Sequence, residues 1–160
     1  MNDVSRFEAT VRDVSFGKNV KIVEPVNMYG CVIDDDAFVG PFVEIQSDVQ
    51  IGARTKIQSH SFICSLVTIG DDCFVGHGVM FVNDTFSHGG PAGGNQNLWK
   101  RTLIGNNVSI GSGVTLLPVT VCSDVVIGAG AVVTKNIEEP GIYAGNPCRR
   151  LRAVNDKSSV

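Results

Sequence analysis

Two histidines and an Asn-Asp pair are the side chains of this sequence best suited to acid-base chemistry. His60 and His77 are 17 residues apart, and Asn83 and Asp84 follow a few residues later. An imidazole titrates near neutral pH, so it can take a proton from an attacking amine or hydroxyl group. Asp84 can pair with an ammonium group or accept its proton. Whether these side chains act together depends on the elements that carry them.

A six-residue period runs through most of the chain. Steps of six from Ile33 reach a branched aliphatic residue or phenylalanine each time: Ile33, Val39, Ile45, Ile51, Ile57, Ile63, Ile69, Val75 and Phe81. Four positions further within each step, small or β-branched residues recur: Ala37, Val43, Val49, Thr55, Ser61, Val67, Cys73, Val79 and Thr85. An α-helix repeats every 3.6 residues and does not fit this period. The pattern predicts a parallel β-helix, in which three hexads close a triangular coil of about 18 residues and the coils stack.

This geometry predicts where the histidines lie. Residues about one coil apart become neighbours along the stack, so His60 and His77 are expected on adjacent coils, one step out of register. Both are expected in the middle of a side, facing outward.

Two sides of the predicted prism are one residue short, from Met28 to Ile33 and from Leu116 to Val121. The first dozen residues fit the period poorly and are expected to form a capping turn, and residues from about 153 to 160 are expected to fray.

The period breaks once, from about residue 86 to 102. This stretch is rich in glycine and contains the single tryptophan, Trp99, and the third histidine, His88. A long polar stretch inside a regular repeat is expected to leave the prism as a loop. We expect Trp99 to dock onto a ligand or a neighbouring subunit, and His88 could reach a neighbouring subunit.

Composition narrows the class of protein. The 160 residues fit one domain and carry a net charge of −3, without the basic runs of a nucleic-acid-binding protein. No stretch is apolar for the length of a membrane span, and the first residues lack the apolar core of a signal peptide. The five dispersed cysteines, without a CxxC pair, fit a reducing cytoplasm. These features predict a cytoplasmic protein that binds neither nucleic acid nor membrane.

Two segments carry a resemblance to a known family. Residues 126–135 (VIGAGAVVTK), followed by Tyr143-Ala144-Gly145-Asn146-Pro147, are typical of hexapeptide-repeat acyltransferases that use acetyl-CoA. Residues 76–84 (GHGVMFVND) are similar to sugar N-acetyltransferases that act on nucleotide-linked 3-amino sugars, the WxcM-like group. The family usually has alanine after Gly-Asn-Pro, where this chain has Cys148, and no consequence is expected because both are small. The resemblance implies a left-handed parallel β-helix, a homotrimer and active sites between subunits.

The resemblance also implies how acetyl-CoA and the amino sugar bind. The cofactor is expected along the coils after the loop, held by backbone amides near Ser109, Gly111, Gly128 and Ala129, with Lys135 and Arg149 near its phosphates. Asn83 matches the asparagine that ends the family segment and is expected to orient the sugar amine. The implied function is N-acetylation of a nucleotide-activated amino sugar in the synthesis of surface polysaccharides such as O-antigen or S-layer glycans, with no metal.

Three other functions remain compatible with the repeat. O-acetylation of a sugar or small alcohol would require a histidine base, because a hydroxyl group is a poor nucleophile. A γ-carbonic-anhydrase-like metal site would need three histidines gathered at a subunit interface, and the chain has that number but no closely spaced pair. A non-catalytic trimeric scaffold is the third.

Overall fold

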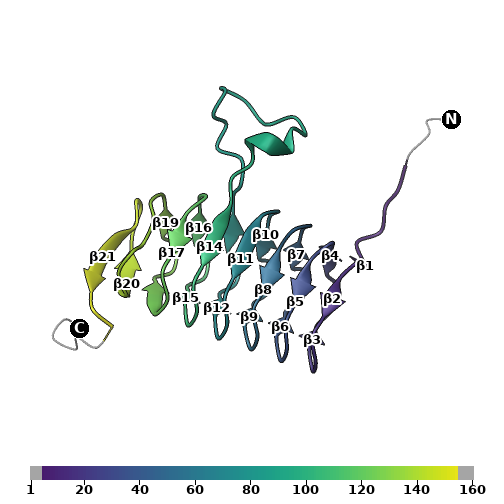
Figure 1. The fold of residues 1–160 in the computed structure, drawn as a ribbon, viewed down its shortest axis with the longest axis horizontal. Coiled ribbons are helices and arrows are strands. Elements are labelled where there is room, and N and C mark those ends of the chain that lie inside the picture. The colour runs from purple at the N-terminus through teal and green to yellow at the C-terminus, as the bar shows by residue number, and fades with distance from the viewer. Residues whose placement is uncertain (1–4, 155–160) are drawn as a thin grey trace.

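The computed structural model describes residues 5–154, which form a triangular prism of stacked coils (Figure 1). Each coil contributes one short strand to each of three parallel sheets, which we name A, B and C in chain order. Within residues 5–154 the one helical element is a 3-10 turn, η1 (Gln96–Leu98), and no helix is long and apolar enough to cross a membrane. The chain therefore has the all-β parallel β-helix that the six-residue period predicts, consistent with the left-handed form.

The strands are two to four residues long. Sheet A contains β1 (Val11–Arg12), β4 (Asn27–Tyr29), β7 (Glu44–Ile45), β10 (Phe62–Ile63), β13 (Met80–Phe81), β16 (Thr115–Leu116) and β19 (Val132–Val133). Sheet B contains β2 (Ser15–Phe16), β5 (Val32–Ile33), β8 (Gln50–Ile51), β11 (Val67–Ile69), β14 (Thr102–Ile104) and β17 (Thr120–Val121). Sheet C contains β3 (Lys21–Ile22), β6 (Phe38–Val39), β9 (Lys56–Ile57), β12 (Phe74–Val75), β15 (Ser109–Ile110), β18 (Val125–Ile127), β20 (Gly141–Ala144) and β21 (Arg149–Arg152). The final pair, β20 and β21, is antiparallel and ends the stack.

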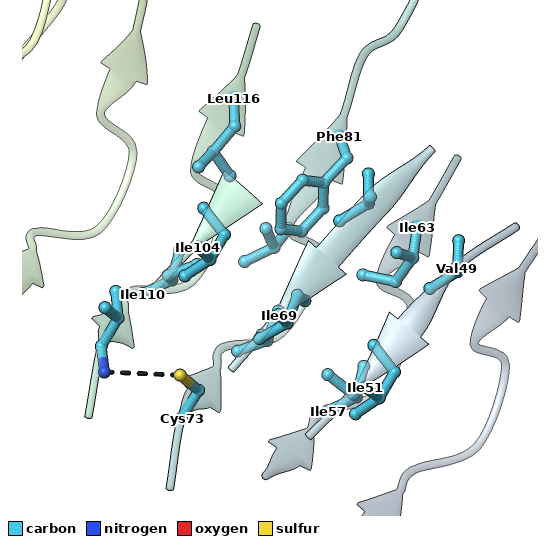
Figure 2. Packing of buried hydrophobic residues seen from close by; sticks show 14 of the residues in the cluster. Val49, Ile51, Ile57, Ile63, Ile69, Cys73, Phe81, Ile104, Ile110 and Leu116 are labelled. Carbon is cyan, nitrogen blue, oxygen red and sulfur yellow. Dashed lines mark hydrogen bonds between the residues drawn. The ribbon is translucent and has the colours of Figure 1, made fainter. Parts of the chain in front are cut away.

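Both residue series predicted to face inward are buried. The first series, from Ile33 to Phe81, is at most 1% exposed, and its members pack on one another along the axis (Figure 2). The second series is also buried, except Thr85, which lies in the loop. Burying each aliphatic side chain contributes about 1.5–3 kcal/mol, so these ladders provide most of the stability of the fold.

Hydrogen bonds from side chains fix the register at the corner between sheets B and C, the B–C corner. Here a backbone N–H of one coil donates to a side chain of the next coil. The pairs are Lys18 to Asp35 Oδ1 (2.6 Å), Ala53 to Asp71 Oδ1 (3.0 Å), Asp71 to Asn106 Oδ1 (2.9 Å) and Asn106 to Ser123 Oγ (2.9 Å). Because residue 53 is alanine, the Asp35 N–H has no acceptor of this kind among the described residues.

Departures from the six-residue period fall at the corner between sheets A and B, the A–B corner. The short sides from Met28 to Ile33 and from Leu116 to Val121 cross it. The inserted loop also leaves the prism there, between β13 and β14, and projects from the stack (Figure 1). At the other two corners the inward residues keep their spacing of six, as in Ile51 and Ile57.

The expected N-terminal capping turn is not present in the described residues. Residues 5–10 are extended and exposed, and β1 begins at Val11, where its backbone pairs with β4. The apolar residue of this segment, Phe7, is 93% exposed, so nothing folds it back onto the end of the prism. Residues 1–4 and residues 155–160 of the expected frayed tail lie outside the described residues.

One buried hydroxyl group gives a test of stability. Thr102 is fully buried at the start of β14, and its Oγ1 has no hydrogen-bond partner among the described residues. Thr102→Val keeps the shape and removes the unpaired hydroxyl, so we expect the free energy of unfolding to rise by about 1–2 kcal/mol. Chemical denaturation at fixed protein concentration measures this change.

Thr55 provides the matched control. It is equally buried, but its hydroxyl donates to the Gly70 carbonyl (2.8 Å) and accepts from the Cys73 N–H (2.9 Å). Thr55→Val should therefore destabilise the protein, because it leaves two buried backbone groups without a partner. Equal effects of the two substitutions would contradict this account.

Candidate functional site

His60 and His77 lie on adjacent coils at the corner between sheets C and A, the C–A corner. Each sits in a turn, His60 between β9 and β10 and His77 between β12 and β13. The prediction that they face outward from adjacent coils is confirmed, since both are exposed. The expectation that they lie mid-side is wrong. The strands on either side of each histidine are only two residues long, so both histidines fall in the turns that join these strands.

The two histidines have different surroundings. The ring of His60 stacks on that of Phe42, with 4.9 Å between ring centroids, and its backbone has a positive φ of 63°. The His77 N–H donates to Ser112 Oγ on the next coil, at 3.2 Å. This bond places His77, Ser112 and the residue one coil further, Ala129, in a row along the C–A corner, each directly after a glycine.

Asn83 and Asp84 lie at the A–B corner, where the loop leaves the prism. Asn83 Nδ2 donates to the Ser65 carbonyl (3.1 Å), and the Asn83 carbonyl accepts from the Lys100 N–H (2.8 Å), which closes the neck of the loop. Strand β13 separates this corner from His77. The structure therefore brings Asn83 together with Asp84 but places the pair and the histidines at opposite ends of one side of the prism.

Three of the predicted cofactor-binding residues, Gly111, Gly128 and Ala129, lie at the C–A corner. The backbone amides of the two glycines already donate hydrogen bonds within the protein. The Gly111 N–H donates to the Ile127 carbonyl (2.8 Å), and the Gly128 N–H donates to the Tyr143 carbonyl (2.7 Å). These bonds join neighbouring coils, so the two glycine amides are not available to a ligand.

The residues that follow these glycines have free amides. Ala129 and Ser112 are exposed, and within residues 5–154 neither backbone N–H has an acceptor. The Ser112 amide faces Ala129, which has no side-chain oxygen, whereas the equivalent His77 amide is satisfied by Ser112 Oγ. The sequence motif does not single out Ser112, although its place directly after Gly111 matches that of Ala129 after Gly128.

The other predicted cofactor residues lie elsewhere on the prism. Ser109 is exposed on β15 beside Val126, in a shallow groove of about 520 Å³ on sheet C. Lys135 and Arg149 line a hollow of about 320 Å³ at the C-terminal end of the stack, together with Arg150. Arg150 lies 3.8 Å from Glu139, whereas Lys135 and Arg149 form no ion pair with any described residue. This end of the prism can therefore hold an anionic group.

The cysteines are poor nucleophiles in this environment. Burial raises the pKa of Cys31 to about 11 and that of Cys64 to about 12. Burial also raises the pKa of Cys148, beside the C-terminal hollow. A protonated thiol does not attack a thioester readily, so these residues do not favour transfer through an acyl-cysteine.

No group of three or more histidine, cysteine, aspartate or glutamate side chains is arranged to hold a metal ion in the described part of the chain. The three histidines are divided between two places, with His60 and His77 at the C–A corner and His88 in the loop.

Two models of hexapeptide repeats match the sequence. Residues 30–65 match the model described as bacterial transferase hexapeptide (six repeats). Residues 66–80 and 101–135 match the model described as hexapeptide repeat of succinyl-transferase. Together the matches cover more than half of the chain and stop on either side of the inserted loop.

Individual proteins resemble parts of the chain. Galactoside O-acetyltransferase of Escherichia coli (strain K12) is 53% identical over 55 residues, which are 34% of this chain and 27% of that protein. The chain spans less than a third of the length of the curated relatives that it matches.

Solved structures share the fold. A hexapeptide transferase family protein from Anaplasma phagocytophilum superposes with a TM-score of 0.72 at 17% identity, covering 91% of this chain and 84% of that one. A single-site mutant of perosamine N-acetyltransferase from Caulobacter crescentus, in complex with CoA and GDP-perosamine, has a TM-score of 0.58 at 20% identity, covering 89% and 57%. These structures show the fold, and the matched repeats, which cover more than half of the chain, show that it belongs to the hexapeptide-repeat acyltransferase family.

Proposed function

We propose that this protein transfers an acetyl group from acetyl-CoA to the amine of a nucleotide-linked amino sugar. The observation that carries the proposal is the pair of exposed, unpaired backbone amides of Ser112 and Ala129 on consecutive coils at the C–A corner, within the described residues. Neighbouring coils are about 4.8 Å apart, so these donors form a short row parallel to the prism axis. The pantetheine arm of CoA is an extended chain with two amide carbonyls, which are suitable acceptors for such a row.

This placement of the pantetheine arm suggests how the rest of CoA is oriented along the prism. On one side the row points toward the C-terminal end of the stack, where Lys135 and Arg149 line the hollow and are the candidates to meet the phosphates. It ends at His77 on the other side, one coil before Ser112. The thioester would then lie near the coil that carries His77 and the loop.

The reaction needs little covalent chemistry from the protein. The neutral sugar amine attacks the thioester carbonyl carbon, a C–N bond forms, and the C–S bond breaks to release CoA. The amine proton passes to a nearby base or to the departing thiolate. His77 and His60 at the C–A corner are the candidate bases on the side of the cofactor, and on the side of the loop Asn83 and Asp84 are the candidates to orient the amine or pair with it.

Two observations support an amino-sugar acceptor. Residues 76–84 are similar to the sugar N-acetyltransferases of the WxcM-like group, and this segment forms β13 and the entry to the loop. The related fold from Caulobacter crescentus was crystallised with CoA and GDP-perosamine, a nucleotide-linked amino sugar. For such a substrate we propose a role in surface polysaccharide synthesis in the cytoplasm, where nucleotide sugars are made.

A panel of acceptors tests this proposal directly. Free CoA thiol is measured over time with acetyl-CoA and nucleotide-linked 3-amino sugars, 4-amino sugars, free amino sugars and neutral sugars in parallel. We expect the highest kcat/KM with a nucleotide-linked amino sugar. Thiol release that depends on a neutral sugar alone would instead identify an O-acetyltransferase.

The O-acetyltransferase alternative is favoured by the match to galactoside O-acetyltransferase, although that match covers only a third of the chain. His60 and His77 separate the two reactions, since attack by a hydroxyl group depends strongly on a base in the transition state and attack by a neutral amine depends on one much less. For N-acetylation we expect His60→Ala and His77→Ala each to keep kcat within about tenfold of the wild type at pH 8. Loss of about 10³-fold or more in either variant would favour O-acetylation.

The cofactor site gives a prediction with an internal control. Ala129→Ser would place a hydroxyl oxygen where it can accept from the Ser112 N–H, as Ser112 Oγ accepts from His77. A donor satisfied within the protein is lost to the ligand, so we expect Kd for CoA to rise roughly 3- to 10-fold. Isothermal titration calorimetry measures this change.

Ala53→Ser is the matched control. It should satisfy the free Asp35 N–H at the B–C corner in the same way, because serine already fills this role at Ser123. CoA affinity should not change, since the substitution is at another corner. Equal weakening by the two substitutions would mean that CoA does not lie along the C–A corner.

We also propose that the active sites form between the subunits of a homotrimer. The outward faces of the sheets expose apolar side chains, among them Phe74, Met80 and Leu103, each about two-fifths exposed. Light scattering during size-exclusion chromatography should give three times the 17.0 kDa protomer mass.

A further inference from the structure

Asp84 uses both of its carboxylate oxygens to hold the inserted loop. Oδ1 accepts from the Phe86 N–H (2.9 Å), and Oδ2 accepts from the Ala92 N–H (2.7 Å). The first bond begins a local turn, and the second reaches eight residues along the chain. The carboxylate therefore closes residues 85–91 into a small lobe on top of the loop neck.

The lobe holds one titratable side chain, His88. A further bond from the Gly89 N–H to the Phe86 carbonyl (2.8 Å) makes a tight turn that carries His88. His88 is exposed, and in the described part of the chain its imidazole has no hydrogen-bond partner. Its neighbours along the chain are serine, glycine and proline, so the hydrogen bonds of the lobe set the backbone from which the imidazole projects.

The base of the lobe is fixed independently. Asn83 ties the loop neck to the coil below through the Ser65 carbonyl and to the returning chain through the Lys100 N–H. The lobe thus has a rigid neck, and the orientation of its upper part depends on the carboxylate of Asp84. The two adjacent residues have separate tasks, since Asn83 holds the neck and Asp84 holds the lobe.

We propose that Asp84 is a positioning residue that acts through His88, and that it does not itself take the proton. Its carboxylate sets the shape of the lobe, and the lobe presents the imidazole of His88 toward the reacting acceptor. This inference rests on the proposed acetyltransferase function. It predicts that the effects of Asp84 and His88 on catalysis are coupled.

A double-mutant cycle tests the coupling. With the best acceptor from the panel, Asp84→Ala should lower kcat about 30- to 100-fold, since a misplaced group near the reacting atoms costs this much, while KM for acetyl-CoA stays within about twofold. In a His88→Ala background, the same Asp84→Ala substitution should lower kcat less than about threefold. Asp84→Asn keeps one acceptor oxygen and should fall between the wild type and alanine.

Three outcomes would overturn the proposal. An equal loss of kcat from Asp84→Ala in both backgrounds means that Asp84 acts on the substrate directly. Disappearance of the acid limb of the pH profile of kcat/KM in Asp84→Asn, with His88→Ala unaffected, means that Asp84 is the base. Unchanged kcat in Asp84→Ala means that the clamp has no role in catalysis.

A measurement without substrate separates this inference from the proposed function. Amide hydrogen exchange should show protection at Phe86 and Ala92 in the wild type, lost in Asp84→Ala and kept in Asp124→Ala. Asp124 is the control, because its carboxylate accepts from Asn107 Nδ2 (2.7 Å) at the B–C corner, far along the chain from the lobe. Lost protection without activity on any acceptor would reject the acetyltransferase proposal but keep the clamp. Unchanged exchange would reject the clamp itself.

Discussion

Replacing Gly76 by alanine is expected to lower the free energy of unfolding by about 3 kcal/mol, near the upper end for an overpacked core. A Cβ at this position would lie 2.6 Å from the Ser112 nitrogen and 2.8 Å from the Gly111 carbonyl carbon. These are backbone atoms of the next coil, so no flexible side chain can move away. The two coils would have to separate, which would weaken the hydrogen bond from the Gly76 N–H to the Ile110 carbonyl.

Gly78, two residues later in the same turn, is the matched control. Its φ is +65°, but a Cβ there would meet nothing within 4 Å. Gly78→Ala should therefore cost only the strain of a left-handed backbone, about 1 kcal/mol. Both values are measured by urea denaturation at one protein concentration, because assembly contributes to apparent stability. A Gly76→Ala variant as stable as Gly78→Ala would contradict the close stacking at this corner.

Removing the inserted loop is expected to abolish sugar acetylation, by about 10³-fold or more, and to leave the prism folded. The next coil has a short connection at the same corner, which can serve as the template for the shortened loop. Phe81 pairs with Leu116, and Leu103 pairs with Thr120, so Val82 and Thr102 occupy the places of Leu117 and Val119. One residue, Pro118, joins those two positions, and a single proline can replace residues 83–101.

The shortened protein should keep its melting temperature within a few degrees, because the loop adds no residue to the core. It should also bind CoA, since the amides of Ser112 and Ala129 lie at another corner. Calorimetry of CoA binding and initial rates with the best acceptor measure the two effects. Sugar acetylation that survives the deletion would show that the loop has no part in the site.

The sequence predicted the fold because every coil repeats the same pattern of inward-facing positions. Inward positions must be apolar or small on each turn, so the period is visible without any knowledge of distant contacts, and the loop appears as an interruption. The histidines show the limit of this reasoning. The period indicated their coil, but the division of each hexad into a two-residue strand and a turn placed them at a corner.

The cofactor residues show a second limit. The motif predicts that the amides of Gly111 and Gly128 bind the cofactor, but these amides join neighbouring coils. Which amide remains free depends on whether the residue one coil further has a side-chain acceptor. This is a relation between positions about one coil apart, as for Ser112 and Ala129, and it is apparent only once the register is known. The clamp of Asp84 on Ala92 likewise depends on the path of the loop.

The three corners of the prism also differ in whether their connections can be lengthened. A one-residue insertion at the B–C corner would move Asp71 or Asn106 away from its backbone donor and turn the following inward residues toward solvent. The A–B corner already accepts short and long connections, and lengthening a flexible connection costs only about 0.6 kcal/mol per doubling. New loops, whether acquired during evolution or grafted by design, should therefore be tolerated along this single edge, where they could change acceptor specificity while the edge proposed to bind CoA stays intact.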